Sequence, residues 1–285
     1  MNKKTICFIV LIFVLLALVA CNRRQQNQNR QEISQIQQEI GQEIEQVQEQ
    51  VPIQYNSEDD FRWQREGDGI IITGYIGSNM NVNIPPQIQG LPVTGIGNNA
   101  FRDGDWEGEH PSAVWISKYQ LTSVTIPYGV TKIGDGAFRD NQLTNIIIPD
   151  SVIEIGGLAF AGNQLISATL PNGITYIRWE AFAGNRLTNI TIPNSVIQID
   201  EWAFAGNRLT NITIPDNITK IEGGAFSGND LTTVIIGKNV TLWFDVRAID
   251  YTGGFGSEFA EFYKSQGSRA GTYTYSNGQW NVQLR

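Results

Sequence analysis

Apolar residues recur along the middle of the chain with a period of 22 residues. A leucine stands at the same place in six successive units, an Ile-Pro or Leu-Pro pair follows it in five of them, and an Ala-Phe pair ends those five units. A fixed period of this length is typical of a solenoid, in which each unit packs only on its neighbours. The recurring positions are Leu121, Leu143, Leu165, Leu187, Leu209 and Leu231, then Pro127, Pro149, Pro171, Pro193 and Pro215, and finally Phe138, Phe160, Phe182, Phe204 and Phe226.

The residue types of one unit predict how its coil folds. In the unit that starts at Leu187, apolar β-branched residues alternate with polar ones toward the proline, which predicts a short strand. Pro193 ends that strand because proline has no donor for a ladder. Stacked coils bury each large apolar side chain, and each one contributes roughly 1.5–3 kcal/mol. The positions expected to point inward are Leu187, Ile190, Ile192, Val196, Ile199, Ala203 and Phe204.

An asparagine stands two residues before each of the later leucines. Its amide both donates and accepts hydrogen bonds, so this column can bridge backbone groups of adjacent coils. We expect a structural role, rather than a catalytic one, for Asn141, Asn163, Asn185, Asn207 and Asn229.

The unit L-T-x-I-x-I-P-x-x-V-x-x-I-x-x-x-A-F-x-x-N resembles the BspA-like leucine-rich repeats of bacterial surface lipoproteins, over roughly residues 58–242. The segment 84–101 resembles the first, longer repeat of that family. The resemblance implies a right-handed, mostly β solenoid, with short turns or 3-10 segments on one face and a cap at each end. It implies attachment to host or neighbouring cells and supplies no catalytic residue. The usual glycine after the second isoleucine is replaced in the middle repeats by Arg178, Asp200 and Glu222.

The N-terminus predicts export and lipid attachment. Two lysines precede an apolar run from Ile6 to Val19, which is typical of a signal peptide over residues 1–20. The run ends in Leu-Val-Ala-Cys21, which resembles the lipobox of bacterial lipoproteins, so Cys21 is expected to receive the lipid. The alternative is an ordinary secretory site in which Cys21 is incidental. Cleavage before Cys21 leaves one cysteine and excludes an intramolecular disulfide.

Residues 21–57, rich in Gln and Glu, predict a tether. Ile33, Ile36 and Ile40 recur 11 residues later as apolar residues, a spacing that keeps one stripe on a helix. The segment is either an amphipathic stalk that self-associates or a solvated spacer, and Gly41 favours the spacer. The formal charge of −8 at pH 7 argues against nucleic acid as a partner.

Two cap regions and one insert interrupt the regular pattern. Asp68-Gly69 predicts a hairpin that caps the solenoid, which is expected to extend over residues 58–242. Residues 243–285 predict a second cap, with a helix over 257–266 and a hairpin at Asn277-Gly278. An acidic insert near residues 102–120 contains His110, the single histidine, and is expected to emerge as a loop.

No motif predicts catalysis. His110 has no ligand partners at a recognisable spacing, and the glycine-rich segment 253–257 lacks the lysine of a phosphate-binding loop. We therefore expect no enzyme activity, no metal and no cofactor.

The remaining candidate is a binding surface. If the apolar positions of each strand face inward, uncharged hydroxyl and amide side chains face outward along a sheet, and solenoids use such faces to bind. A second patch of aromatic and cationic residues beside Tyr176 is either an exposed anchor or local core on the convex side. The candidate residues are Thr125, Asn145, Ser167, Thr169, Asn189, Thr191, Asn211 and Thr213 on the strands, and Arg178, Trp179 and Trp202 in the patch.

Together these features predict a lipid-anchored protein of the cell envelope, in the outer membrane or at the cell surface. Its adhesin-like repeat domain is expected to bind a protein or glycan on host or neighbouring cells, and Cys21 to bind the membrane through its lipid. The alternative is a structural or assembly lipoprotein that faces the periplasm.

Overall fold

The computed structural model describes residues 53–102, 120–238, 240–242 and 257–284. The chain divides into two compact units, Met1–Gln54 and Tyr55–Arg285, and the fold below is that of the second. The signal segment, Cys21, nearly all of the tether, His110 and most of the acidic insert lie outside the described residues.

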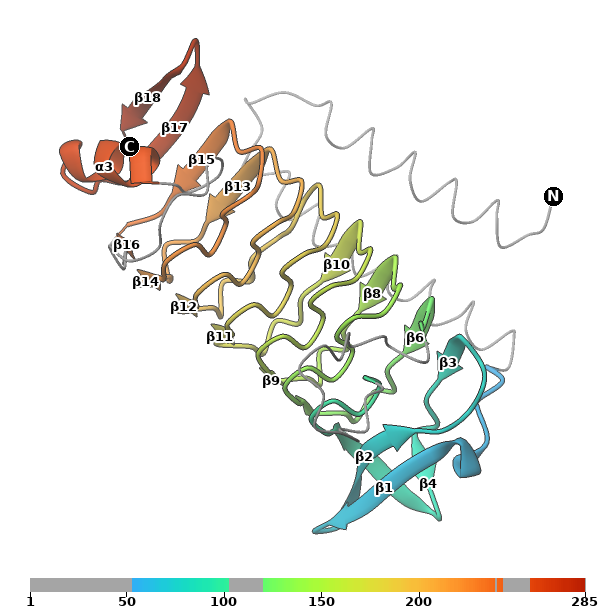
Figure 1. The fold of residues 1–285 in the computed structure, drawn as a ribbon. Helices are drawn as coiled ribbons and strands as arrows, with labels where there is room; N and C mark the ends of the chain where they lie inside the picture. Colours follow the sequence, from blue (N-terminus) through green and yellow to red (C-terminus); the bar gives the residue numbers. More distant parts are fainter. Residues whose placement is uncertain (1–52, 103–119, 239, 243–256, 285) are drawn as a thin grey trace, which may run out of the picture. The chain divides into compact units, whose positions relative to one another are not determined.

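The repeats form a β-solenoid of about seven turns with little helix. One row of parallel strands runs along it (Figure 1), and three pairs of neighbouring strands in this row are hydrogen-bonded at corresponding positions of their coils, as Asn145 is with Ser167. Residues 189–191 occupy the same place in their coil without strand pairing. The row comprises β3 (Asn81–Asn83), β6 (Ser123–Thr125), β8 (Asn145–Ile147), β10 (Ser167–Thr169), β13 (Asn211–Ile214) and β15 (Thr233–Ile236).

A second row of short strands forms another side of each coil. It begins at β5 (Leu91–Ile96) and continues in two-residue strands, which pair in parallel from coil to coil except between β9 and β11. The sequence predicts turns or 3-10 segments on this side of each coil, and the structure has short strands there in addition to turns. Among the described residues, 3-10 helix occurs only at η1 (Glu58–Asp60), before the repeats. The two-residue strands are β7 (Lys132–Ile133), β9 (Glu154–Ile155), β11 (Tyr176–Ile177), β12 (Gln198–Ile199), β14 (Lys220–Ile221) and β16 (Thr241–Leu242).

A column of stacked phenylalanines fills the interior. All of its rings are fully buried, and successive centroids lie 4.8–5.6 Å apart with interplanar angles of 10–18°. Backbone hydrogen bonds cross between coils beside the rings, as from Phe160 N–H to the Ala181 carbonyl at 2.9 Å. The predicted inward positions of the unit that starts at Leu187 are all buried, which confirms them. The column consists of Phe101, Phe138, Phe160, Phe182, Phe204 and Phe226.

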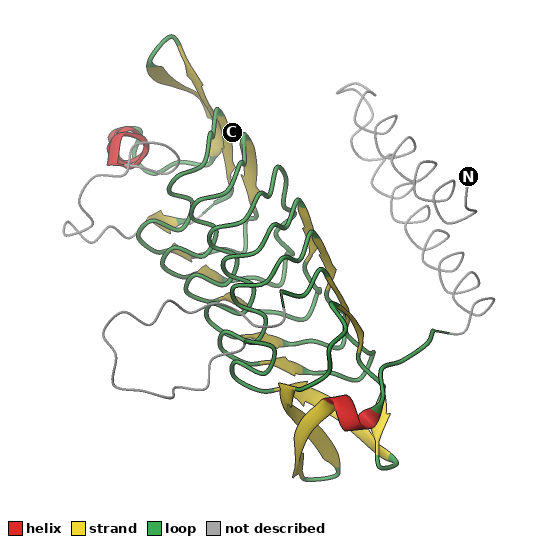
Figure 2. Cartoon of the chain, turned by 45° about the vertical axis from the view of Figure 1, so that its right-hand side comes forward, coloured by secondary structure: helices red, strands yellow, loops and turns green. Residues whose placement is uncertain are grey.

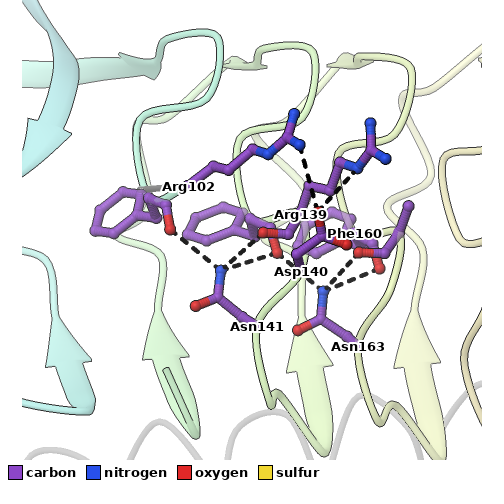
Figure 3. A network of polar contacts seen from close by, with 9 residues as sticks. Arg102, Arg139, Asp140, Asn141, Phe160 and Asn163 are labelled. Carbon is purple, nitrogen blue, oxygen red and sulfur yellow. Dashed lines mark hydrogen bonds and ion pairs between the residues drawn. The ribbon is translucent and has the colours of Figure 1, made fainter. Parts of the chain in front are cut away.

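The asparagine column bridges the coils, as predicted. Asn163 Nδ2 donates to the carbonyls of Phe138 and Phe160 at 2.9 and 3.1 Å, and its Oδ1 accepts from Leu143 N–H at 3.1 Å. Figure 3 shows the amides of Asn141 and Asn163 reaching the carbonyls of successive turns in the same way. Each amide thus satisfies buried backbone groups that the turns leave unpaired.

A hairpin closes the N-terminal end of the solenoid (Figure 2). β1 (Phe61–Glu66) pairs antiparallel with β2 (Gly69–Tyr75), and β2 pairs in parallel with β5. The turn is made by residues 67 and 68, and Gly69 already pairs with Glu66. β4 (Gln87–Ile88) forms a second small hairpin with β5.

The C-terminal end is closed by a helix and a hairpin. β17 (Gly271–Ser276) pairs antiparallel with β15, and β18 (Gln279–Leu284) pairs antiparallel with β17. In α3 (Ser257–Ser265), Phe259 and Tyr263 are buried. The Tyr263 hydroxyl donates to the Val240 carbonyl at 3.1 Å, and burial raises the pKa of Tyr263 to about 12.

Candidate binding surface

The outward side chains of the first strand row form one exposed face, here called the strand face. Its members are exposed from β6 through β13, whereas Thr233 and Ile235, on the strand that pairs with β17, are half-buried. The alternation of each strand therefore places the eight predicted strand residues in solvent on one side of the solenoid. They are Thr125, Asn145, Ser167, Thr169, Asn189, Thr191, Asn211 and Thr213.

The strand face is uncharged at these positions, and some of its polar groups are bonded to one another. Ser167 Oγ lies 2.8 Å from Asn145 Oδ1, and Thr125 Oγ1 lies 2.8 Å from Asn83 Oδ1. Asn83 belongs to β3, which extends the face by one coil into the N-terminal region. Sequence reasoning missed β3, although Asn81 and Asn83 alternate with a buried valine before an Ile-Pro pair, as in the repeats.

Exposed apolar side chains interrupt this polar face. Ile147, at the end of β8, is 76% exposed, and Ile166, beside the start of β10, is 52% exposed. Neighbouring coils have a threonine in place of Ile166, at Thr144 and Thr188. A partner would gain most by covering these isoleucines because burial of apolar surface contributes about 25 cal/mol per Å².

The predicted tryptophan patch is divided between coils. Trp179 is 44% exposed, and its indole stands over Gly157 of the preceding coil, where an added Cβ would lie 2.3 Å from the ring. Trp202 is half-buried and stands over Gly224 of the following coil. The two rings lean in opposite directions, so they do not form one contact surface. Of the two tryptophans, only Trp179 is exposed.

The charged residues beside Trp179 are engaged with one another. The Arg178 guanidinium lies 4.7 Å from the centre of the Tyr176 ring and forms a 3.8 Å ion pair with Asp200. Gln198 Nε2 donates to the carboxylates of Asp200 and Glu222 at 2.8 and 3.2 Å. Burial raises the pKa of Asp200, although the Gln198 hydrogen bond opposes that shift. This network indicates a stabilising role for Arg178.

Close packing between coils explains why an earlier repeat has a glycine where the middle repeats have these charged residues. An added Cβ at Gly156 would lie 2.5 Å from the backbone nitrogen of Asp135, which is closer than real contacts allow. In the middle coils the equivalent positions carry the side chains of Arg178, Asp200 and Glu222 instead: Arg178 pairs with Asp200 of the next coil, and Glu222 accepts from Gln198 of the preceding coil.

The described part of the chain offers no metal centre. No group of three or more His, Cys, Asp or Glu side chains within it has a geometry that could hold an ion. No helix among the same residues is long and apolar enough to cross a bilayer.

Residues 111–232 match the family model for the BspA type leucine rich repeat region, in six copies. Among solved structures, the chain is similar to a leucine rich cell surface protein from Faecalibacterium prausnitzii A2-165, with 25% identity and a TM-score of 0.47 over 81% of this chain and 61% of that one. The chain thus spans less than two thirds of that protein's crystallised length. No curated protein matches the sequence.

Two more solved leucine-rich-repeat proteins are similar to the chain. The protein from T. pallidum is 21% identical, with a TM-score of 0.37 over 68% of this chain and 83% of that one. The protein from Bacteroides ovatus is 20% identical, with a TM-score of 0.34 over 69% and 68%. Residues 111–232 thus match the model for the BspA type leucine rich repeat region, and the described repeats fold as a β-solenoid of the leucine-rich-repeat type.

Proposed function

We propose that this is a non-catalytic binding protein, anchored in the bacterial cell envelope by a lipid on Cys21, and that its strand face binds a protein or glycan of another cell. The observation that carries the proposal is the exposed face from β6 to β13, which combines uncharged hydroxyl and amide groups with the exposed Ile147 and Ile166. An extended face of this kind lets several coils contact one large ligand at once.

The chemistry of the face favours contact through shape and hydrogen bonds. Hydroxyl and amide groups both donate and accept, so they suit the hydroxyls of a glycan or the backbone of a protein. Because the predicted strand residues carry no charge, affinity through them is expected to depend only weakly on salt, whereas binding through the acidic insert or Arg178 would weaken as salt screens it.

Two bulky charges on the strand face are expected to weaken this binding strongly. Ligands would be captured from surface-labelled host or bacterial cells on the immobilised full chain. The Thr169→Arg/Thr191→Arg variant should bind them at least about tenfold more weakly, because the arginines hold a large partner away from the face and bury charge beneath it. Thr175→Arg is the matched control, since Thr175 is exposed on the other side of the same coil as Thr169.

A second variant distinguishes the face from the acidic insert. Deletion of residues 103–115 should leave ligand capture unchanged if the strand face is the site. Intact binding by the double arginine variant, together with loss of binding on deletion, would assign the site to the insert.

The lipid anchor has its own test. Cys21→Ser is expected to move the protein from the detergent phase to the aqueous phase in detergent partitioning, because serine lacks the thiol that receives the lipid. Cys7→Ser, at the other cysteine of the chain, should leave the partitioning unchanged. A Cys21→Ser protein that stayed in the detergent phase would contradict the anchor.

Protease shaving of intact cells should degrade the repeat domain, whereas a periplasmic structural lipoprotein would be spared.

A further inference from the structure

Within the described part of the chain, the C-terminal hairpin leaves one edge of a sheet without a neighbouring strand. β18 is the last strand of the sheet β13-β15-β17-β18, and among the described residues no strand pairs with its outer edge. In Figure 1, β18 lies on the far side of β17 from β15. A free edge presents a row of unpaired N–H and C=O groups to other chains.

The hairpin turn fixes which backbone groups of β18 point outward. Asn277 and Gly278 have φ angles of 51° and 76°, as in the type I′ turn of a two-residue loop. Such a loop is flanked by a hydrogen-bonded pair, and pairs of this kind alternate with non-bonded pairs along an antiparallel ladder. The groups that point away from β17 are therefore those of Trp280, Val282 and Leu284.

The edges at the N-terminal end are protected, whereas the edge of β18 is not. β1 carries Arg62, Arg65 and Glu66, and its register shifts after Arg62. The outer edge of β3 is covered, because Asn56 N–H donates to the Asn83 carbonyl at 2.9 Å and Asn56 Oδ1 accepts from Asn83 N–H at 2.8 Å. β18 has no charged residue, no proline and no register shift over its six residues. Charges and bulges are the usual means by which proteins block edge pairing.

The side chains of β18 alternate between two chemical classes. Trp280 and Val282 pack against the core, and the Trp280 ring lies 4.7 Å from Phe259. Leu284 is on the same face but stands opposite Gly271, which offers no side chain to cover it, and is 40% exposed. The opposite face carries only amides, from Gln279, Asn281 and Gln283.

We propose that β18 pairs antiparallel with β18 of a second copy of this chain, about a twofold axis beside Val282. Val282 then stands opposite its own copy, and Trp280 stands opposite Leu284 of the second copy. All outward groups pair, in about six backbone hydrogen bonds. Directly opposite residues share a face, so apolar side chains meet apolar ones and Asn281 meets Gln283. Leu284 gains the neighbour that Gly271 does not provide.

A neighbouring register does not fit. A shift by one residue would set amides opposite apolar side chains and would direct half of the facing N–H groups away from the partner. β18 contains no charged residue, so no repulsion between like charges within the strand opposes its pairing with a second copy.

Oxidative cross-linking tests the register. In the full chain carrying Cys7→Ser and Cys21→Ser, Val282→Cys should form a covalent dimer under mild oxidation, because paired Cα atoms lie about 5.5 Å apart. Gln279→Cys should stay monomeric, since the two copies of residue 279 would lie roughly 20 Å apart. Absence of a Val282→Cys dimer, or equal cross-linking of the two variants, would overturn the proposal.

A backbone variant tests the edge itself. In sedimentation velocity, the unmodified full chain in detergent should show twice the protein mass of Val282→Pro, which removes an outward N–H and leaves the bonds to β17 in place. Val282→Thr is the matched control and should remain dimeric. Circular dichroism checks that both variants are folded. A monomeric unmodified chain, as expected if the edge instead takes up an extended peptide, or a folded Val282→Pro dimer would overturn the proposal.

Discussion

Replacing Phe182 by alanine is expected to lower the free energy of unfolding by about 3–5 kcal/mol. Phe182 is fully buried, and its ring stacks on Phe160 at 5.4 Å and on Phe204 at 5.6 Å. The loss combines the transfer free energy of the ring with the cavity left between two coils. This cavity can relax little, because strand pairing, backbone hydrogen bonds and the Asn185 amide hold the spacing of the coils.

Chemical denaturation would measure this loss, with hydrogen exchange to locate it. Protection should fall first in the coils that contain Phe160 and Phe204, because a repeat protein is stabilised by contacts between neighbours. Thr191→Ala, on the exposed strand face, is the control and should change stability by less than about 0.5 kcal/mol. A larger effect at Thr191 than at Phe182 would reverse the inward and outward assignments.

The period of the sequence was enough to predict the core and the strand face. A position that repeats every 22 residues lies in the same place in every coil, so one unit identifies the buried column of Phe182 and the exposed column of Thr191. The amide of Asn185 could be assigned for the same reason, since a polar residue at a fixed corner must meet backbone groups of the next coil.

Features that depend on contacts between particular coils were not predictable in this way. After β5, the second-row strands have two residues each, too few for a periodic signal, and they form by hydrogen bonding to neighbouring coils. Trp179 and Trp202 are separated because each ring packs over a glycine of a different neighbouring coil. Gly157 and Gly224 could have predicted these ring positions, because each stands where another repeat has a bulkier residue.

The network around Asp200 also depends on several coils at once. The repeats show in sequence that a glycine is replaced by charged residues. They do not show that Arg178 and Gln198 contact Asp200, or that Gln198 also contacts Glu222. Its members come from three different coils, and each alone resembles an ordinary exposed polar residue.

Replacing Asn185 by alanine is expected to lower the free energy of unfolding by about 2–4 kcal/mol, because a buried polar group left without a partner costs about 1–3 kcal/mol. Asn185 Oδ1 accepts from Leu165 N–H at 3.0 Å, and its Nδ2 donates to the carbonyls of Phe160 and Phe182 at 2.9 and 3.1 Å. Alanine leaves these groups in a site too closed for bulk water. Asn189→Ala, on the exposed face, is the control and should cost less than about 0.5 kcal/mol.

An isosteric variant separates the hydrogen bonds from the packing. Asn185→Asp keeps the shape of the amide, but its carboxylate cannot donate to the Phe160 and Phe182 carbonyls. Burial and those two oxygens should raise the pKa of this carboxyl in the folded state above its value in the unfolded chain. The stabilisation from the neutral acid is then fully present below the unfolded pKa and is lost as pH rises through the folded pKa. Denaturation of Asn185→Asp and the unmodified chain from pH 4 to 8 would measure this difference, and a pH-independent difference would show that the amide column acts through packing alone.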